Sequence, residues 1–500
     1  MKKIVIIFTI ISIFAKIIAF GRELVLSYFF GAGEISDVFL LSMTLPVTIF
    51  GFISAGVTSG YIPIYQRARN EEGEESALSF TNNVITLLMV LCIIIIMVYF
   101  MIPKQLLGAF ASGFNESTLE LARRFTNFSI WATVLTAIVT VLSGYLQIND
   151  KIKITALVSV PLNTGVILTI FLSAGLGNIF ILPVGFLVSS LAQVIFLCFF
   201  SVRNRFKYFI ILDRNNKYLK AFISSLTMLV LSGSLLQVNV LIDRTLATRI
   251  LVGGLSILEY GNRINDFVMG LTIIPISAAL FPMMTKVKTN HLELGKTLID
   301  GIRLSSIIII PASVITIVFS DVIVRILYLR GAFDAQDAIM TSEIVRYYGM
   351  GILAFSFREM ILKCFYSLED IKTPVINSSI GIICNIVLNF LLLRIMGLGG
   401  LALATSISAV LSVVLLYRSL KKYLKTIHIG KLLIRNCTLF VLAACVCYVA
   451  LLLYRYLSSW VNGEIIPFLV SVAVFGIVYL AITIITGMIS KEELKTLLKR

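Results

Sequence analysis

Charged side chains lie inside segments of this sequence that are otherwise strongly apolar. An ionisable group in the hydrocarbon region of a bilayer costs from about 3 to more than ~10 kcal/mol, so it usually faces a cavity or a partner. Such groups can bind a charged ligand away from bulk water, and we take them as candidate functional residues. They are Lys16, Arg22, Glu23, Asp37, Asp243, Arg244, Arg263, Asp266, Arg358 and Glu359.

The cations of this set suit an anionic ligand. Arginine offers two parallel donors to a phosphate group, and lysine offers a compact point charge. Lys16 and Arg263 have no oppositely charged residue next to them in the sequence, which favours ligand binding. Facing a water-filled cleft, such cations would attract a phosphorylated substrate. Local charge compensation near a helix end is the alternative for two adjacent pairs, Arg22–Glu23 and Asp243–Arg244.

Signals for catalysis or for a metal site are weak. The two histidines, His291 and His428, form no cluster, and the seven cysteines follow no metal or redox spacing. The acidic run 71–75 is typical of a solvated loop. The sequence has neither a glycine-rich phosphate loop nor a nucleophile motif, so we expect a protein that is not an enzyme.

Composition indicates the elements that must position the charged residues. The 500 residues are 58% hydrophobic and 14% charged, whereas soluble chains are about 45–50% apolar and about 25% charged. We therefore predict an all-α polytopic membrane protein with about 14 transmembrane helices. Their expected ranges are 4–30, 36–62, 79–102, 125–148, 154–174, 178–202, 219–248, 257–282, 299–327, 346–367, 373–393, 399–417, 436–457 and 465–488.

The net charge of +16 is explained by topology and does not point to a nucleic-acid partner. Lysine and arginine concentrate at both ends of the chain and in the loops after even-numbered spans, which places both termini in the cytoplasm. Arg303 and Lys363 lie near predicted cytoplasmic ends, where long side chains reach the interface, so we assign them no function.

Two heavily basic loops, 203–220 and 418–435, divide the spans into groups of six, six and two. We expect two six-helix pseudo-repeat halves, 1–215 and 216–430, followed by two extra helices in 431–500. Two weak matches support the repeat. Asp150 matches Asp370 at a spacing of 220, and Pro63 matches Pro282 at a spacing of 219. Transporters commonly use such repeats, with substrate between the halves.

Several motifs resemble one known family. The stretch 20–39, FGRELVLSYFFGAGEISDVF, followed by Leu45-Pro46, is similar to the amino-terminal signature of the MurJ (MviN) lipid II flippases. The segments 260–264, YGNRI, and 365–374, FYSLEDIKTP, resemble two further motifs of that family. Fourteen spans also suit this family better than the MATE exporters, which usually have twelve. Both families belong to the multidrug/oligosaccharidyl-lipid/polysaccharide (MOP) exporter superfamily.

The resemblance implies two six-helix lobes around a cationic cavity, and two carboxyl-terminal helices beside a groove for the lipid tail. It implies transfer of undecaprenyl-diphosphate-linked peptidoglycan precursor, lipid II, across the bacterial inner membrane by alternating access. Lys16, Arg22 and Arg263 would bind the diphosphate. Gating or charge-partner residues would be Glu23, Asp37, Asn262 and Arg358. A sodium site reported for some members would fall on Asp243, Asn385, Asn389 and Thr405.

The sequence also departs from the family pattern. The arginine usual in the second span has no counterpart near Phe50-Gly51, and Ala15 replaces a hydroxyl residue. These departures leave open a flippase for another polyprenyl-diphosphate glycan, of the capsule or O-antigen type. A MATE-like cation-coupled drug exporter is less favoured, because the cations would repel its substrates. We expect a lipid-linked oligosaccharide, membrane lipids and cell-wall synthesis proteins as partners, and no required cofactor.

Overall fold

A computed structural model describes residues 2–424 and 430–488, and every regular element in these ranges is a helix. The chain divides into two compact units, Met1–Ser256 and Ile257–Arg500, which are described separately. In both units large apolar side chains are exposed along the helices, as expected where lipid replaces water as the solvent.

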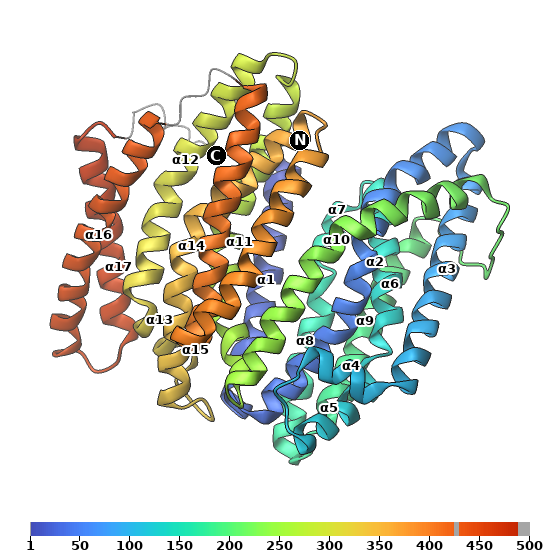
Figure 1. The fold of residues 1–500 in the computed structure, drawn as a ribbon, viewed down its shortest axis with the longest axis horizontal. Coiled ribbons are helices and arrows are strands. Elements are labelled where there is room, and N and C mark those ends of the chain that lie inside the picture. Colours follow the sequence, from blue (N-terminus) through green and yellow to red (C-terminus); the bar gives the residue numbers. More distant parts are fainter. Residues whose placement is uncertain (1, 425–429, 489–500) are drawn as a thin grey trace. The chain divides into compact units, whose positions relative to one another are not determined.

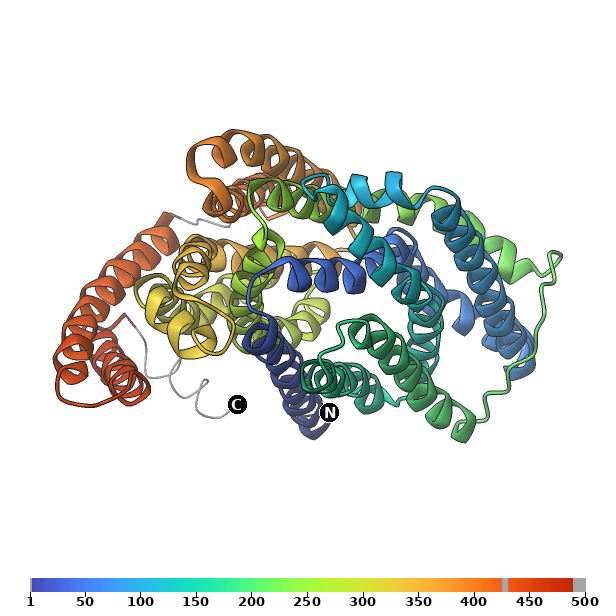
Figure 2. The ribbon, with the colours of Figure 1, turned by 90° about the horizontal axis from the view of Figure 1, so that it is seen from below.

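The first unit contains ten helices (Figure 1). The long helix α2 is central, because it packs against α3, α5, α6 and α10, while α1 packs along α8 and α8 along α9 (Figure 2). The ten are α1 (Lys2–Phe30), α2 (Glu34–Glu72), α3 (Glu74–Met101), α4 (Pro103–Phe110), α5 (Glu116–Ser129), α6 (Ala132–Ile148), α7 (Ile152–Ala156), α8 (Ser159–Leu176), α9 (Ile181–Arg203) and α10 (Lys217–Ile250).

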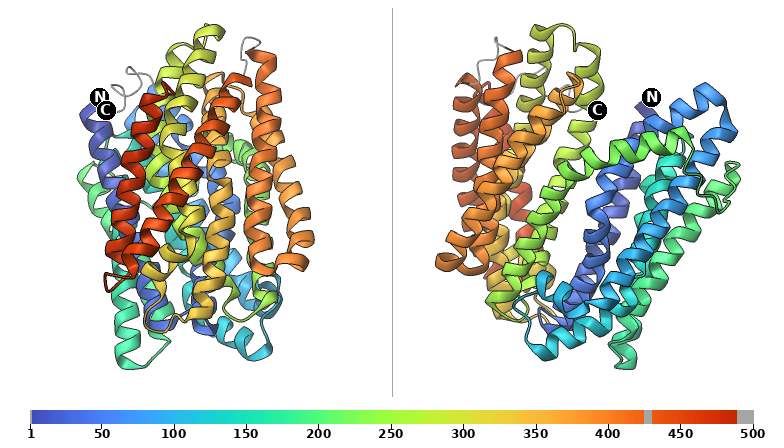
Figure 3. Two further views of the ribbon diagram at one scale, coloured as in Figure 1. Left: turned by 90° about the vertical axis from the view of Figure 1, so that its left-hand side faces the viewer. Right: turned by 45° about the vertical axis from the view of Figure 1, so that its right-hand side comes forward.

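The second unit contains seven helices. The helix α14 packs against α12, α13 and α15, and α12 also packs against α16, which forms an antiparallel pair with α17 (Figure 3). The seven are α11 (Gly254–Lys286), α12 (His291–Val318), α13 (Ser320–Tyr328), α14 (Ala335–Ser367), α15 (Lys372–Tyr423), α16 (Gly430–Ser458) and α17 (Ile465–Ile485).

All fourteen expected spans fall on helical segments, but several are built differently from one straight helix. The fourth is the pair α5 and α6, bent by 44°, and the ninth is divided between α12 and α13. The eleventh and twelfth are the two helical parts of α15, separated as predicted by a kink at Gly397, where φ is 57°. Nine helices in the described ranges are long and apolar enough to cross a membrane, or ten counting the bent pair, so the number fourteen stays a prediction.

The turns after α6 and after α14 share one backbone geometry. Asp150 and Glu369 both have φ of 60°, although neither is glycine. In each turn the next N–H donates to the carbonyl five residues before it, at 2.8 Å after α6 and 3.1 Å after α14. The equivalent residues are 219 positions apart, as Pro63 and Pro282 are, so the match of Asp150 with Asp370 is corrected by one residue.

This repeated turn supports an internal repeat without fixing its limits. The predicted halves 1–215 and 216–430 describe the repeat and stay a prediction. The two compact units divide the chain after Ser256 and not after residue 215, because α10 packs against α2 and so belongs to the first unit.

Candidate functional site

Arg22 and Glu23 form a buried ion pair on α1. The Arg22 Nη2 donates to Glu23 Oε1, and Nη1 donates to Asn163 Oδ1 on α8 at 3.0 Å. The Arg22 Nε is buried without a hydrogen-bond partner in the part of the chain that is described. The charge compensation that the sequence left open is therefore present, and the guanidinium still has one unused buried donor.

Asn163 was not predicted from the sequence. It is neutral, and a single amide in an apolar span gives no charge signal. Its contact with Arg22 crosses 141 positions of sequence, which no local pattern could indicate. The available clue was a polar side chain in the middle of the fifth predicted span.

Lys16 lies two turns before Glu23 on α1, and a separation of seven residues places both on one face of the helix. Its side chain is half-buried. The first unit thus carries two cations and one carboxylate within about 11 Å along α1, by the rise of an α-helix.

Asp37 accepts hydrogen bonds from the backbone at the amino end of α11. Its Oδ2 accepts from the Gly253 N–H at 2.8 Å, and its Oδ1 accepts from the Ser256 N–H and hydroxyl, both at 2.7 Å. The side chain is 1% exposed. A carboxylate in this position supplies the amino end of a helix with an acceptor and a favourable charge. Asp37, on α2, therefore caps the amino end of α11, although it is 216 positions away from Gly253 in the sequence.

Two further contacts join α2 to α10. The Arg244 Nη1 donates to Thr48 Oγ1 at 3.2 Å. A Cβ added to Gly51 would lie 2.7 Å from the Gln237 amide, so Gly51 makes room for this polar side chain. The sequence singled out Arg244, but Thr48 and Gln237 were missed because neither carries a charge.

Arg263 is less isolated than the sequence suggests. On α11 its Nη2 lies 3.9 Å from Glu259 Oε2, and its Nη1 lies 3.8 Å from Asp266 Oδ2. These carboxylates are four residues before and three after it, so the helix brings them to its face although neither is adjacent in sequence. The lack of an oppositely charged neighbour in the sequence therefore did not show whether Arg263 is paired. Asn262 is half-buried beside it on the same helix.

Arg358 lies on α14, and no ion pair joins it to Glu359 within the described residues. Glu359 pairs with Lys363 instead, at 3.2 Å. The Arg358 Nε is buried and has no hydrogen-bond partner within the described residues. Arg358 therefore remains a gating candidate, and nothing in the structure tests that role.

The predicted sodium ligands fall in both units. Asn385, Asn389 and Thr405 lie together on α15, whereas Asp243 belongs to the first unit. Asn389 Nδ2 donates to Asn385 Oδ1 at 3.2 Å, and Asn385 Nδ2 donates to Thr405 Oγ1 at 3.3 Å. The three form a chain of neutral hydrogen bonds. The acceptors in this chain are Asn385 Oδ1 and Thr405 Oγ1, and the sodium site stays a prediction.

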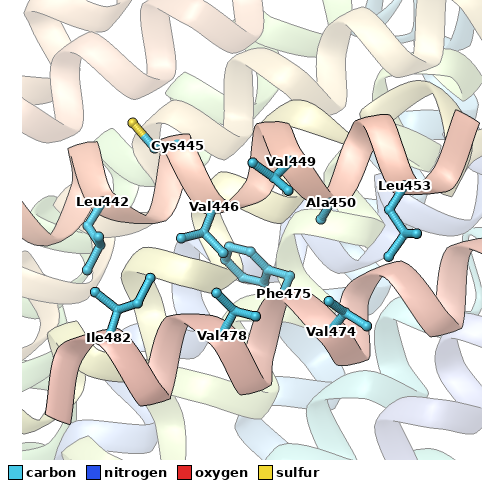
Figure 4. A pocket seen from close by; sticks show the side chains of 10 residues that line it. All are labelled: Leu442, Cys445, Val446, Val449, Ala450, Leu453, Val474, Phe475, Val478 and Ile482. Carbon is cyan, nitrogen blue, oxygen red and sulfur yellow. The ribbon is translucent and has the colours of Figure 1, made fainter. Parts of the chain in front are cut away.

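An apolar groove of about 300 Å³ lies between α16 and α17 (Figure 4). Ten side chains line the groove, and all of them belong to α16 or α17. The lining residues are Leu442, Cys445, Val446, Val449, Ala450, Leu453, Val474, Phe475, Val478 and Ile482.

Long apolar helices that also carry buried or half-buried charged residues are typical of a multi-pass membrane transporter, and the comparisons with known proteins agree. The sequence profile described as lipid II flippase MurJ matches residues 26–471. The chain belongs to the MurJ family.

Relatives and solved structures of this kind cover most of the chain. "Probable lipid II flippase MurJ" of Rickettsia prowazekii is 28% identical over 423 residues, 82% of each chain. The protein of the same name from Helicobacter pylori (strain J99) is 26% identical over 459 residues, 86% of this chain and 96% of its own.

Among solved structures, a lipid II flippase MurJ in an inward closed conformation matches with a TM-score of 0.81 and 23% identity, over 96% of this chain and 98% of that one. An inward-facing MATE multidrug transporter matches with a TM-score of 0.69 and 15% identity, over 85% of this chain and all of its own. These two similarities establish the fold that the sequence predicted.

Proposed function

We propose that this protein is a lipid II flippase, which moves the undecaprenyl-diphosphate-linked peptidoglycan precursor from the inner to the outer leaflet by alternating access. The match to the family over residues 26–471 carries the proposal. The cations on α1 and α11 support it, because Arg22 is buried, Lys16 and Arg263 are half-buried, and a diphosphate headgroup needs compensating charge inside an apolar protein.

Arg22, Lys16 and Arg263 are the proposed diphosphate ligands. The Arg22 guanidinium is held by Glu23 and Asn163, so its planar fork is ordered before the substrate arrives. Arg263 makes two long ion pairs, of 3.9 and 3.8 Å, and these can be exchanged for a phosphate at small cost. Ordered donors and exchangeable counter-charges are what a site needs in order to bind a dianion and release it again.

Asp37 is the proposed gate residue. Three hydrogen bonds that its carboxylate accepts fix the first turn of α11 in this conformation. Alternating access requires contacts that can be made in one state and broken in another. Because charge-assisted hydrogen bonds contribute about 1.5–3 kcal/mol each, Asp37 can bias this equilibrium strongly. We give Glu23, Asn262 and Arg358 supporting roles in holding or releasing the cations.

The proposed setting is the bacterial inner membrane, with both termini in the cytoplasm. The distribution of lysine and arginine supports this orientation. Lipid-linked substrate and membrane lipids are the partners, with cell-wall synthesis proteins as further ones. We also propose that sodium is not required, because the three α15 residues form a neutral hydrogen-bonded chain.

Complementation tests the function. The intact chain should restore growth to a bacterium depleted of its own lipid II flippase. If it reaches normal levels in the membrane and does not restore growth, the proposal is wrong and a flippase for a capsule or O-antigen glycan is favoured. A gene neighbourhood of cell-wall or polysaccharide genes would provide an independent indication.

A further inference from the structure

Five consecutive apolar side chains are exposed in the linker between α9 and α10, which Figure 1 shows as an extended stretch beside α3. They occupy 208–212, and the exposed fraction reaches 61% at Phe209 and 85% at Ile210. The run lies outside the predicted spans, between 178–202 and 219–248. Contiguous exposed apolar surface of this kind marks a contact with a membrane or another molecule. The linker therefore indicates an apolar environment outside the protein.

The linker is attached at both ends of the run to two adjacent amides of α3. Asn82 Nδ2 donates to the Lys207 carbonyl at 3.0 Å. Asn83 Oδ1 accepts from the Asp213 N–H at 2.6 Å. Both amides are buried, although they belong to an otherwise apolar helix. The linker thus satisfies polar groups of α3 with its backbone and presents the side chains of 208–212 to the surroundings.

These attachments set the depth of the linker. Asn82 and Asn83 are three and four residues inside the predicted span 79–102, which is about 5 Å by the rise of an α-helix. Tyr208 extends further along α3, where its hydroxyl lies 3.2 Å from Thr86 Oγ1. The apolar run is therefore at the level of the membrane boundary, where lipid can contact it.

The backbone of the run limits how far it can enter the bilayer. In the ranges that the structure describes, the N–H and C=O groups of 208–212 form no hydrogen bond with the protein. Unpaired backbone groups are strongly disfavoured in hydrocarbon, whereas water and lipid headgroups satisfy them at the surface. The side chains favour lipid and the backbone requires polar partners. A segment lying in the interface, parallel to the membrane, meets both conditions.

Basic residues flank the apolar run on both sides. Four cations and one carboxylate lie in 203–214, and none of the four takes part in an ion pair with any residue that the structure places. Lys217, at the start of α10, differs because it pairs with Glu72 at 2.6 Å. Cations beside an apolar interfacial segment are attracted to anionic headgroups. The four without an ion pair are Arg203, Arg205, Lys207 and Arg214.

We propose that the linker 203–216 is an in-plane membrane anchor that binds anionic glycerophospholipids. The run 208–212 enters the outer part of the acyl layer, and the four flanking cations bind lipid phosphates. Asn216 follows as the cap of α10, and its Oδ1 accepts from the Tyr218 and Leu219 N–H groups, both at 3.0 Å. The anchor therefore fixes the level at which α10 begins. It does not depend on the proposed transport function.

Tryptophan fluorescence tests the anchor, because the chain has only two tryptophans, Trp131 and Trp460. In the full-length Trp131→Phe/Trp460→Phe background, Ile210→Trp reports on the apolar run. Asn215→Trp is the matched control, since the Asn215 N–H donates to Asp213 Oδ1 at 2.9 Å in the polar turn that follows. In vesicles of phosphatidylcholine and phosphatidylglycerol with brominated acyl chains, we expect blue-shifted and strongly quenched emission from Ile210→Trp, and little quenching from Asn215→Trp.

Two results would overturn the anchor. Equal quenching in Ile210→Trp and Asn215→Trp would show that the apolar run has no special contact with lipid. A blue shift in Ile210→Trp without quenching by brominated lipid would show that a second copy of the chain or another protein covers the run.

The lipid preference tests the cations. Quenching of Ile210→Trp by brominated phosphatidylglycerol, compared with brominated phosphatidylcholine, gives the relative affinity for the two headgroups. We expect phosphatidylglycerol to be preferred, and Lys207→Gln to reduce the preference about fivefold, because one cation is removed from the anionic surface. Arg124→Gln, on an exposed arginine that pairs with Glu120 at 3.4 Å, should leave it unchanged. Equal affinity for both lipids, or an unchanged preference in Lys207→Gln, would overturn the assignment of the cations.

Ile210→Ser separates membrane binding from a role in folding. Because the Ile210 side chain is exposed, the Tm in detergent without added lipid should stay the same. The rise in Tm on adding phosphatidylglycerol should become smaller, since a ligand of the folded state binds less tightly. A lower Tm without lipid, together with an undiminished rise on adding lipid, contradicts the proposal.

Discussion

At the scale of single residues, Arg22 illustrates why the type of cation matters. Two of its nitrogens reach partners on different helices, Glu23 on α1 and Asn163 on α8. A lysine ammonium has the same charge but is a single point, and it cannot reproduce a planar fork. Buried charge without its geometry should therefore be insufficient for binding a diphosphate.

We predict that Arg22→Lys reduces the rate of lipid II transfer by about tenfold or more, since at least one charge-assisted hydrogen bond is lost. Growth of a depleted strain and the amount of lipid II in the outer leaflet measure this effect. Arg67→Lys, on an exposed arginine that pairs with Glu71 at 2.8 Å, is the control and should behave like the unmodified chain. Normal transfer by Arg22→Lys would show that charge alone is required.

Asp37 carries a second prediction at this scale. In Asp37→Asn one carbonyl oxygen still accepts from Ser256, but the amide nitrogen meets the Gly253 N–H, which is also a donor. We expect the free energy of unfolding to fall by about 2 kcal/mol and the Tm to fall with it. The variant should also restore less growth to a strain depleted of its own flippase. Ser256→Ala removes only the hydroxyl contact and should have a smaller effect. An unchanged Tm in Asp37→Asn would contradict the capping role.

At the scale of elements, the start of α11 depends on a glycine as well as on Asp37. Gly253 has φ of 89°, and a Cβ there would lie 2.2 Å from the Ala32 carbonyl oxygen. We predict that Gly253→Ala destabilises the protein by at least about 1 kcal/mol through the backbone conformation, with a further cost from the clash. Thermal unfolding measures it. Gly33→Ala has nothing within 4 Å of the added Cβ and should leave the Tm nearly unchanged.

Hydrophobic runs located the helices but not their internal breaks. The predicted spans 299–327 and 125–148 are each divided between two helices, α12 and α13 in the first and α5 and α6 in the second. The break between the predicted spans 373–393 and 399–417, by contrast, is confirmed by the kink at Gly397. Apolar length shows that a segment can cross a membrane, whereas bends depend on backbone angles that hydropathy does not contain. The one-residue error in the repeat has a similar cause, because Asp150 and Glu369 are equivalent by backbone conformation and not by side-chain identity.

Charge in apolar segments located the ionisable residues of the candidate site but not its neutral ones. It identified Arg22, Asp37 and Arg263, but it could not identify Asn163, since an amide has no charge and its partner is distant in sequence. It also treated Arg263 as isolated, because carboxylates three and four residues away are adjacent on a helix and not in the sequence.

At the scale of the whole molecule, the α15 residues bear on whether transfer depends on sodium. Since two neutral hydrogen bonds join Asn385, Asn389 and Thr405, we predict that replacing sodium by potassium changes lipid II transfer by less than about twofold, a difference below 0.5 kcal/mol. Transfer in vesicles with each cation in turn measures it. A strict requirement for sodium would contradict this prediction and would mean that the hydrogen bonds among Asn385, Asn389 and Thr405 break when an ion binds.

The central claim is that this molecule carries lipid II across the membrane with cations from α1 and α11. The most direct measurement is the lipid II accessible to a hydrolase added outside cells whose own flippase has been depleted. We predict that the intact chain restores outer-leaflet lipid II, and that Arg22→Ala and Arg263→Ala do not, at equal membrane levels. Restoration by both variants would contradict the assigned site, and failure of the intact chain would contradict the function itself.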